Sequence, residues 1–88
     1  MSSSTVVIDL HGLTFIEAKT ELLDSLEGHI QLGYSIFEVI HGFKGGTVLR
    51  DYVRISFRRD FDRSFKKRFT LSVRSLNNGS TLLTILPI

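Results

Sequence analysis

Residues 5–18, TVVIDLHGLTFIEA, contain the signals that decide the fold of this chain. The first part of this stretch, up to Leu10, is β-branched and apolar, which is typical of a buried β-strand. Gly12 breaks the run, and Thr14 with Glu17 then forms the pattern of a capping box at the start of a helix. The stretch therefore predicts a strand that passes directly into a helix.

An apolar stripe continues the helix, and a glycine ends it. The stripe repeats every four residues and consists of Ala18, Leu22, Leu26 and Ile30. One face of the helix is therefore expected to be buried. Gly33 supplies the stop, and residues 35–40, which are again largely apolar, predict the second strand.

The second half of the chain predicts another helix and a closing hairpin. Thr47 begins the helix, whose end stays open because residues 58–68 fit either a loop or a helical extension. Residues 69–76 and 81–86 are predicted strands. Asn78-Gly79 between them is a strong signal for a hairpin turn.

These elements follow the order β-α-β-α-β-β. Strands that are separated by a helix pair in parallel with right-handed crossovers, whereas the last two strands pair antiparallel. The expected fold is α/β in its two-layer α+β form, a mixed four-stranded sheet with two helices on one face. Residues 1–88 are expected to form one domain, with residues 1–4 disordered. The order of the strands in the sheet stays open.

The composition excludes several classes of protein. The 88 residues include no cysteine, which excludes a disulfide framework and a thiolate zinc site. No apolar run approaches the ~20 residues that span a bilayer, and the N-terminus lacks the basic and apolar regions of a signal peptide. We therefore expect a cytoplasmic protein that has no membrane partner.

The charge is unevenly distributed, although the net charge is only +2. Residues 1–49 carry two lysines against six acidic residues, a net charge of −4, whereas residues 50–68 carry eight basic against three acidic residues, a net charge of +5. A basic block of this size suggests a polyanionic partner such as nucleic acid. The alternative is a solvated surface that only aids solubility.

Polar motifs stand where the two predicted parallel strands end. Asp9 and His11 follow the first strand, and His41 follows the second. Ligands of open α/β sheets gather at this edge, so the motifs are expected within about 10 Å of each other if the strands are neighbours. Two histidines beside a phosphate can act as general base and general acid, with Asp9 orienting His11. In RNA the base would activate the adjacent 2′-hydroxyl without a metal.

Two alternatives stay open for these residues. Asp9 with one or both histidines offers ligands for a divalent cation as cofactor, although one carboxylate and two imidazoles make a thin magnesium site and suit zinc better. The structural alternative is that Asp9 hydrogen-bonds the next turn and His11 only packs there.

A glycine-rich loop precedes the second helix. Its glycines, Gly42, Gly45 and Gly46, allow backbone conformations that are closed to other residues. A loop that leads into a helix can turn several amide groups toward an anion, and Lys44 and Arg50 would add positive charge. The alternative is a connector that needs its glycines only for the turn.

The basic block supplies further candidate phosphate contacts. Arg50, Arg54 and Arg58 are spaced by four residues and share one face of the second helix. The phenylalanines that are interleaved with the block either stack on unpaired bases or pack in the core, which is the commoner role. They are Phe61, Phe65 and Phe69.

Two motifs together resemble those of the Smr (small MutS-related) domain family. Residues 9–14, DLHGLT, followed by Glu17 and Ala18, look like the first Smr motif. Residues 41–50, HGFKGGTVLR, look like the second, although many members alternate the glycines that are adjacent here. The resemblance covers residues 7–54 and returns at residues 79–86.

The resemblance implies both a fold and an activity. The family fold is β-α-β-α-β-β, similar to the C-terminal domain of bacterial translation initiation factor three. The family's activities are DNA nicking and endonucleolytic RNA cleavage, and some members are tied to ribosomes. By position, Asp9 and His11 match the motif tied to activity. The glycine loop is matched by His41, Gly42, Gly45 and Gly46, and the basic residue of the second helix by Arg50.

The leading hypothesis is a nucleic-acid-binding Smr domain with endonuclease activity, a hydrolase for which RNA is favoured over DNA. The first rival is a non-catalytic module that binds nucleic acid or a ribosomal surface, and the second is a protein-interaction domain. Salt-dependent binding without cleavage would point to the first rival. The oligomeric state stays open.

Overall fold

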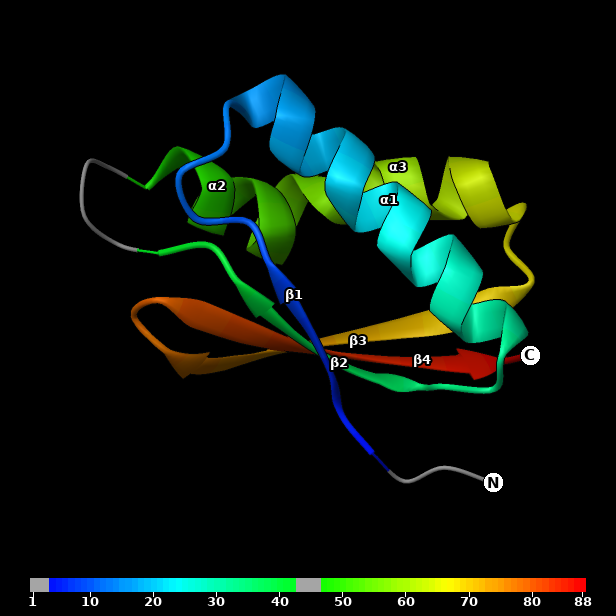
Figure 1. Ribbon diagram of the computed structural model, residues 1–88. Helices are drawn as coiled ribbons and strands as arrows, with labels where there is room; N and C mark the ends of the chain where they lie inside the picture. Colours follow the sequence, from blue (N-terminus) through cyan, green and yellow to red (C-terminus); the bar gives the residue numbers. More distant parts are fainter. Residues whose placement is uncertain (1–3, 43–46) are drawn as a thin grey trace.

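A computed structural model describes residues 4–42 and 47–88 and shows a four-stranded mixed sheet with two helical segments on one face (Figure 1). The strands are β1 (Val6–Asp9), β2 (Ile36–Ile40), β3 (Phe69–Asn77) and β4 (Ser80–Pro87). Their order in the sheet is β1-β2-β4-β3, with β1 and β2 parallel and β4 antiparallel to both of its neighbours. The predicted fold class is confirmed. Disorder was expected for residues 1–4, and residues 1–3 of that range lie outside the described residues.

The first helix, α1 (Phe15–Gln31), begins at the predicted capping box. The Thr14 hydroxyl accepts a hydrogen bond from the Glu17 amide at 3.2 Å, and the Glu17 carboxylate accepts one from the Thr14 amide at 2.9 Å. The stripe that faces the sheet is buried at Ala18, Leu22 and Leu26. The predicted stop, Gly33, has a φ of 95°, which favours glycine and ends the helix.

The second helical segment consists of α2 (Val48–Asp51), a π-helical turn, η1 (Tyr52–Ser56), and α3 (Phe57–Phe65), without a break. Residues 58–65 are therefore helix. The π turn is closed by a bond from the Phe57 amide to the Tyr52 carbonyl, and it brings their ring centroids to 5.8 Å. Both side chains can then enter the core. Thr47 precedes the segment as predicted, but its hydroxyl donates to the Asp51 carboxylate at 3.1 Å and caps no amide.

The closing hairpin has its two-residue turn at residues 78–79, as predicted. Asn77 Oδ1 stabilises the turn by accepting the Gly79 amide at 2.8 Å and the Ser80 hydroxyl at 3.1 Å. Because β4 pairs with β2, this turn lies beside the residues that follow β2 (Figure 1). None of the helices in the described part of the chain has the length and apolar character that crossing a bilayer requires.

Candidate active site

The two predicted motifs meet at one edge of the sheet because β1 and β2 are parallel neighbours. Asp9 is the register partner of Ile40, and the Leu10 amide donates to the Ile40 carbonyl at 2.7 Å. Gly42 has a φ of 78°, and a Cβ built there would lie 3.4 Å from the Cβ of His11. The φ value favours glycine at this position, and the short distance shows that the two loops lie close together here.

Asp9 holds His11 through two hydrogen bonds to one carboxylate oxygen. Asp9 Oδ1 accepts the His11 backbone amide at 3.1 Å and the ring Nδ1 at 2.5 Å. Because the carboxylate accepts, Nδ1 donates in this bond, so in the neutral form of the ring the proton lies on Nδ1 and the lone pair on Nε2. The side chain of His11 is 68% exposed. The side-chain bond, followed by the backbone bond, lowers the pKa of Asp9 and keeps the carboxylate ionised.

His41 lies in the opposite environment, with only 5% of its surface exposed. Its Nδ1 donates to the Gly42 carbonyl at 2.9 Å, and its Nε2 accepts from the Thr81 hydroxyl at 2.9 Å. Burial lowers the pKa of His41, the bond to Gly42 opposes this effect, and the charges of Arg54 and Arg50 lower the pKa further. The ring is therefore held neutral, with both nitrogens bonded inside the protein.

Arg54 connects the same threonine to the β3–β4 turn. Its Nε donates to Thr81 Oγ1 at 2.8 Å, which leaves the threonine proton for His41. Its Nη2 donates to the carbonyls of Asn77 and Ser80 at 2.6 and 3.2 Å. The polar hydrogens of Nε and Nη2 are thus used within the fold.

The β3–β4 turn also fixes the start of the second loop directly. The carbonyl of Gly79 accepts the backbone amides of His41 and Gly42, both at 3.0 Å. We refer to the three hydrogen-bonded side chains of His41, Thr81 and Arg54 as the buried clasp. The clasp joins the second loop, the π-helical turn and the hairpin into one unit.

The other predicted binding residues divide between the loop and the helix. Residues 43–46, which include three of the predicted phosphate-binding positions, lie outside the described residues. Arg50 is partly exposed and donates to the Asp51 carboxylate at 3.5 Å. Arg58 is exposed on α3. Of the interleaved phenylalanines, Phe61 is fully buried in the core, so the core alternative holds for that residue.

Comparisons with known proteins identify the family. The family model of the Smr domain matches residues 8–84 of the chain. The chain belongs to the Smr domain family. The crystal structure of the Smr domain of Thermus thermophilus MutS2 matches with a TM-score of 0.71 and 32% identity, over 93% of this chain and 99% of that one. Endonuclease MutS2 of Thermus thermophilus is 43% identical over 53 residues, which is 60% of this chain and 7% of the relative's length.

The described residues of this Smr domain do not supply a complete set of ligands for a metal ion. They gather no group of three or more histidine or acidic side chains that could hold a metal ion. Asp9 and His11 are bonded to each other, and together they supply only two of the four or more ligands that zinc or magnesium takes. The pair fits the orientation of a proton-transferring histidine instead.

Sequence reasoning missed Thr81 and the bonds that Arg54 makes within the fold, while the predicted phosphate contact of Arg54 stays a prediction. A signal for Thr81 exists in the alternation of β4, whose inward positions are otherwise apolar. Thr81 is fully buried beside Leu83 and Ile85 on the same face of the strand. A buried hydroxyl at such a position has a hydrogen-bond partner, but the chain does not show that the partners are 27 and 40 residues away.

Proposed function

We propose that this Smr domain binds nucleic acid and cleaves a phosphodiester bond, with single-stranded RNA favoured over DNA in the cytoplasm. The Asp9–His11 pair carries the proposal. An exposed imidazole with a fixed tautomer stands at the sheet edge where ligands of α/β folds bind. The similarity to the Smr domain of an endonuclease supports the same reaction class.

The reaction begins at the ribose next to the scissile phosphate. His11 Nε2 takes the proton of the 2′-hydroxyl, and the 2′-oxygen attacks the adjacent phosphorus. The bond to the 5′-oxygen of the next nucleotide breaks, and that oxygen takes a proton from solvent. The products are a 2′,3′-cyclic phosphate and a 5′-hydroxyl. Asp9 stabilises the imidazolium that forms on His11. RNA is favoured because DNA lacks the attacking hydroxyl.

In this proposal His41 has a structural role, which is to hold the start of the loop that follows β2. The sequence suggested that it is the complementary acid or base, but a ring with both nitrogens bonded and 5% exposure is poorly placed to meet the leaving oxygen. It fixes Gly42 against His11 instead. Amide groups of the glycine loop, together with Lys44, then bind the scissile phosphate.

Flanking phosphates are bound by the basic residues that keep free donors. Arg50 lies in α2, and Arg58 is exposed in the first turn of α3, directly after the π turn. Arg54 donates to the hairpin, so its contribution to binding is indirect.

A second candidate function is binding without cleavage, to nucleic acid or to a ribosomal surface. The charge of residues 50–68 favours it, because a net charge of +5 supplies affinity for any phosphate backbone. This candidate makes no use of the exposed imidazole of His11, which is why we rank it second.

The deciding experiment incubates the protein with end-labelled single-stranded RNA and a matched DNA, in EDTA or in magnesium, with His11→Ala as the control. We expect cleavage of RNA in EDTA that is lost in the variant while binding is retained. Cleavage only in magnesium would show that Asp9 and His11 act as ligands of a metal ion and not as a proton-transferring pair. Binding without cleavage in every condition would establish the second candidate.

A further inference from the structure

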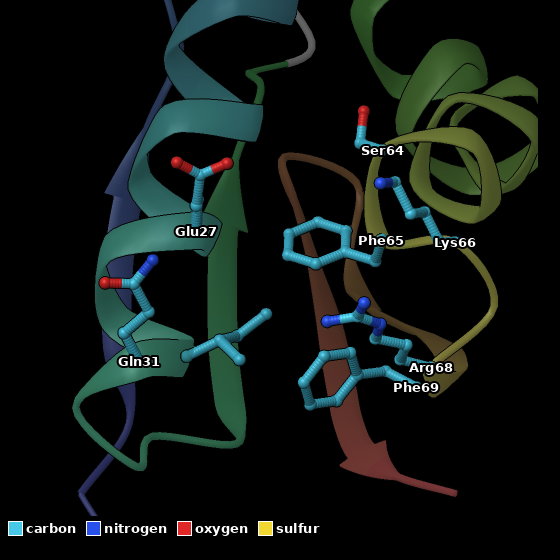
Figure 2. A pocket seen from close by; sticks show the side chains of 8 residues that line it. Glu27, Gln31, Ser64, Phe65, Lys66, Arg68 and Phe69 are labelled. Atoms are coloured by element: carbon cyan, nitrogen blue, oxygen red, sulfur yellow. The ribbon is translucent and has the colours of Figure 1, made fainter.

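A pocket of about 340 Å³ lies at the end of the molecule opposite the candidate active site (Figure 2). It is formed between the last turns of α1 and the turn that leads from α3 into β3, whereas Asp9 and His11 precede the start of α1 (Figure 1). Because α1 has 17 residues, its two ends are about 25 Å apart. The pocket is therefore separate from the site described above.

Two phenylalanine rings form the apolar part of the pocket. Phe65 and Phe69 meet edge to face, with ring centroids 5.8 Å apart and an interplanar angle of 87°. The fully buried Phe61 packs against Phe65 at 4.7 Å and holds it from behind. Both pocket rings stay partly exposed. They offer fixed aromatic surface on which a planar base can stack.

The two walls of the pocket differ in charge. Lys66 and Arg68 come from the α3–β3 turn, and in the described part of the chain neither forms an ion pair. Glu27 and Gln31 face them from α1 (Figure 2). A nucleotide fits this polarity in one orientation, with its phosphate at the cationic wall and the edge of its base toward the carboxylate and amide groups.

The turn at the cationic wall is strained. Lys66 and Lys67 have φ values of 53° and 58°, the left-handed conformation that favours glycine. Each such residue costs roughly 1 kcal/mol relative to the right-handed conformation, and glycine or asparagine is the usual residue at the end of a helix. Both strained positions carry a lysine instead, and of the two only Lys66 lines the pocket.

We propose that this pocket binds one unpaired nucleotide of a single-stranded nucleic acid, with the base on Phe65 and Phe69 and the phosphate at Lys66 and Arg68. A volume of about 340 Å³ is near the lower limit of small-ligand sites, which suits a single base with its ribose. The inference rests on the proposed nucleic-acid binding and deepens it. The bound strand extends along α3 from the active site, so the favoured substrate has an unpaired segment several nucleotides away from the cut.

The test measures binding of a labelled, non-cleavable 2′-O-methyl RNA 12-mer and of an abasic oligonucleotide of the same length. Phe69→Leu keeps apolar volume but removes the ring, so we expect it to weaken binding of the 12-mer about fivefold or more and to leave the abasic strand unaffected. Lys66→Gly removes the charge and relieves the strain. It should raise the melting temperature and weaken binding of both strands.

Lys67→Gly is the matched control, because it relieves the same strain but its side chain lies outside this pocket. It should raise the melting temperature and weaken binding less than Lys66→Gly does. The proposed nucleotide site would be overturned if Phe69→Leu bound the 12-mer with wild-type affinity, or if Lys66→Gly and Lys67→Gly lost equal affinity. A wild-type protein that binds the 12-mer through the pocket but cleaves no RNA would refute the catalytic proposal alone, whereas a wild-type protein that binds neither strand would refute both.

Discussion

His11 and His41 follow neighbouring strands of one sheet, yet their surroundings are opposite. The side chain of His11 is 68% exposed, and within the described residues its hydrogen-bond partner is the Asp9 carboxylate. His41 is 5% exposed, and each of its ring nitrogens is hydrogen-bonded within the protein. The residue type and its place after a strand are the same in both cases. What differs is the set of atoms around the ring nitrogens, and the proposed proton transfer by His11 rests on that difference.

The difference originates in the sheet order. β1 is an edge strand, so the residues that follow it have a neighbour on one side only. β2 lies between β1 and β4, and the β3–β4 turn reaches over the residues that follow it through the Gly79 carbonyl. The inner strand is therefore followed by a buried, fully bonded histidine, and the edge strand by an exposed one.

The largest effect should come from the exposed member of the pair. Asp9→Asn preserves the shape of the side chain but removes the charge that stabilises the His11 imidazolium, so we expect RNA cleavage to fall about 10²-fold or more. The free energy of unfolding should change by less than about 0.5 kcal/mol, because the site is exposed. Single-turnover cleavage and urea denaturation measure the two quantities. Unchanged cleavage in a folded variant would exclude the proposed role of the pair.

The buried clasp should respond in the opposite way. Thr81→Val removes the hydroxyl that serves both His41 and Arg54, which leaves buried polar groups unpaired and should lower the free energy of unfolding by about 1–3 kcal/mol. Thr81→Ser is the matched control, since it keeps the hydroxyl and should retain more of that stability. Urea denaturation of the three proteins measures the difference. A valine variant as stable as the wild type would show that the clasp contributes nothing.

The pH dependence of stability should report the burial of His41. Burial lowers the pKa of His41 in the folded protein, so the unfolded chain binds more protons in the window between the two pKa values. The stability from neutral His41 is complete above the unfolded pKa of about 6.5 and is lost as the pH falls below it. Melting temperatures at pH 7.5 and 5.5 should therefore drop more for the wild type than for His41→Gln. Equal drops would contradict the assignment of a neutral, buried ring.

The smallest expected effect concerns the arginines of the basic face. Arg58→Ala should weaken nucleic-acid binding a few-fold and reduce the slope of log K against log salt by about 1, because an exposed phosphate contact is lost. Arg54→Ala should mainly reduce stability, since that side chain donates to Thr81 and the hairpin. Fluorescence anisotropy over a range of salt concentrations distinguishes them. If both variants gave the same slope of log K against log salt, Arg58 and Arg54 would not differ in the way proposed, with one binding phosphate and the other stabilising the buried clasp.

Local signals in the sequence predicted the elements and several of their ends. The Thr14–Glu17 box and the turn at residues 78–79 are formed by residues within three positions of each other, so the chain itself contains the whole interaction. The meeting of the two motifs was predicted only on the condition that the two parallel strands are neighbours, and the structure meets that condition. The strand order did not, since the pairing of β4 with β2 is a long-range choice.

The buried clasp was beyond sequence reasoning for the same reason. Its bonds join residues that are 27 and 40 positions apart, and one of them depends on a π-helical turn that no periodicity indicated. The sequence therefore placed His41 at the right edge of the sheet but could not show that Thr81 and Gly42 occupy its ring nitrogens.

The most direct test of the contrast between the histidines is a long-range ¹H–¹⁵N correlation spectrum of the histidine side chains, recorded without and with a non-cleavable single-stranded oligonucleotide. We predict that both rings carry their proton on Nδ1, that the oligonucleotide shifts the Nε2 resonance of His11, and that it leaves the nitrogens of His41 in place. Thr81→Val should then shift Nε2 of His41 alone. A proton on Nε2 of His41, or an equal response of both rings to the oligonucleotide, would contradict the account.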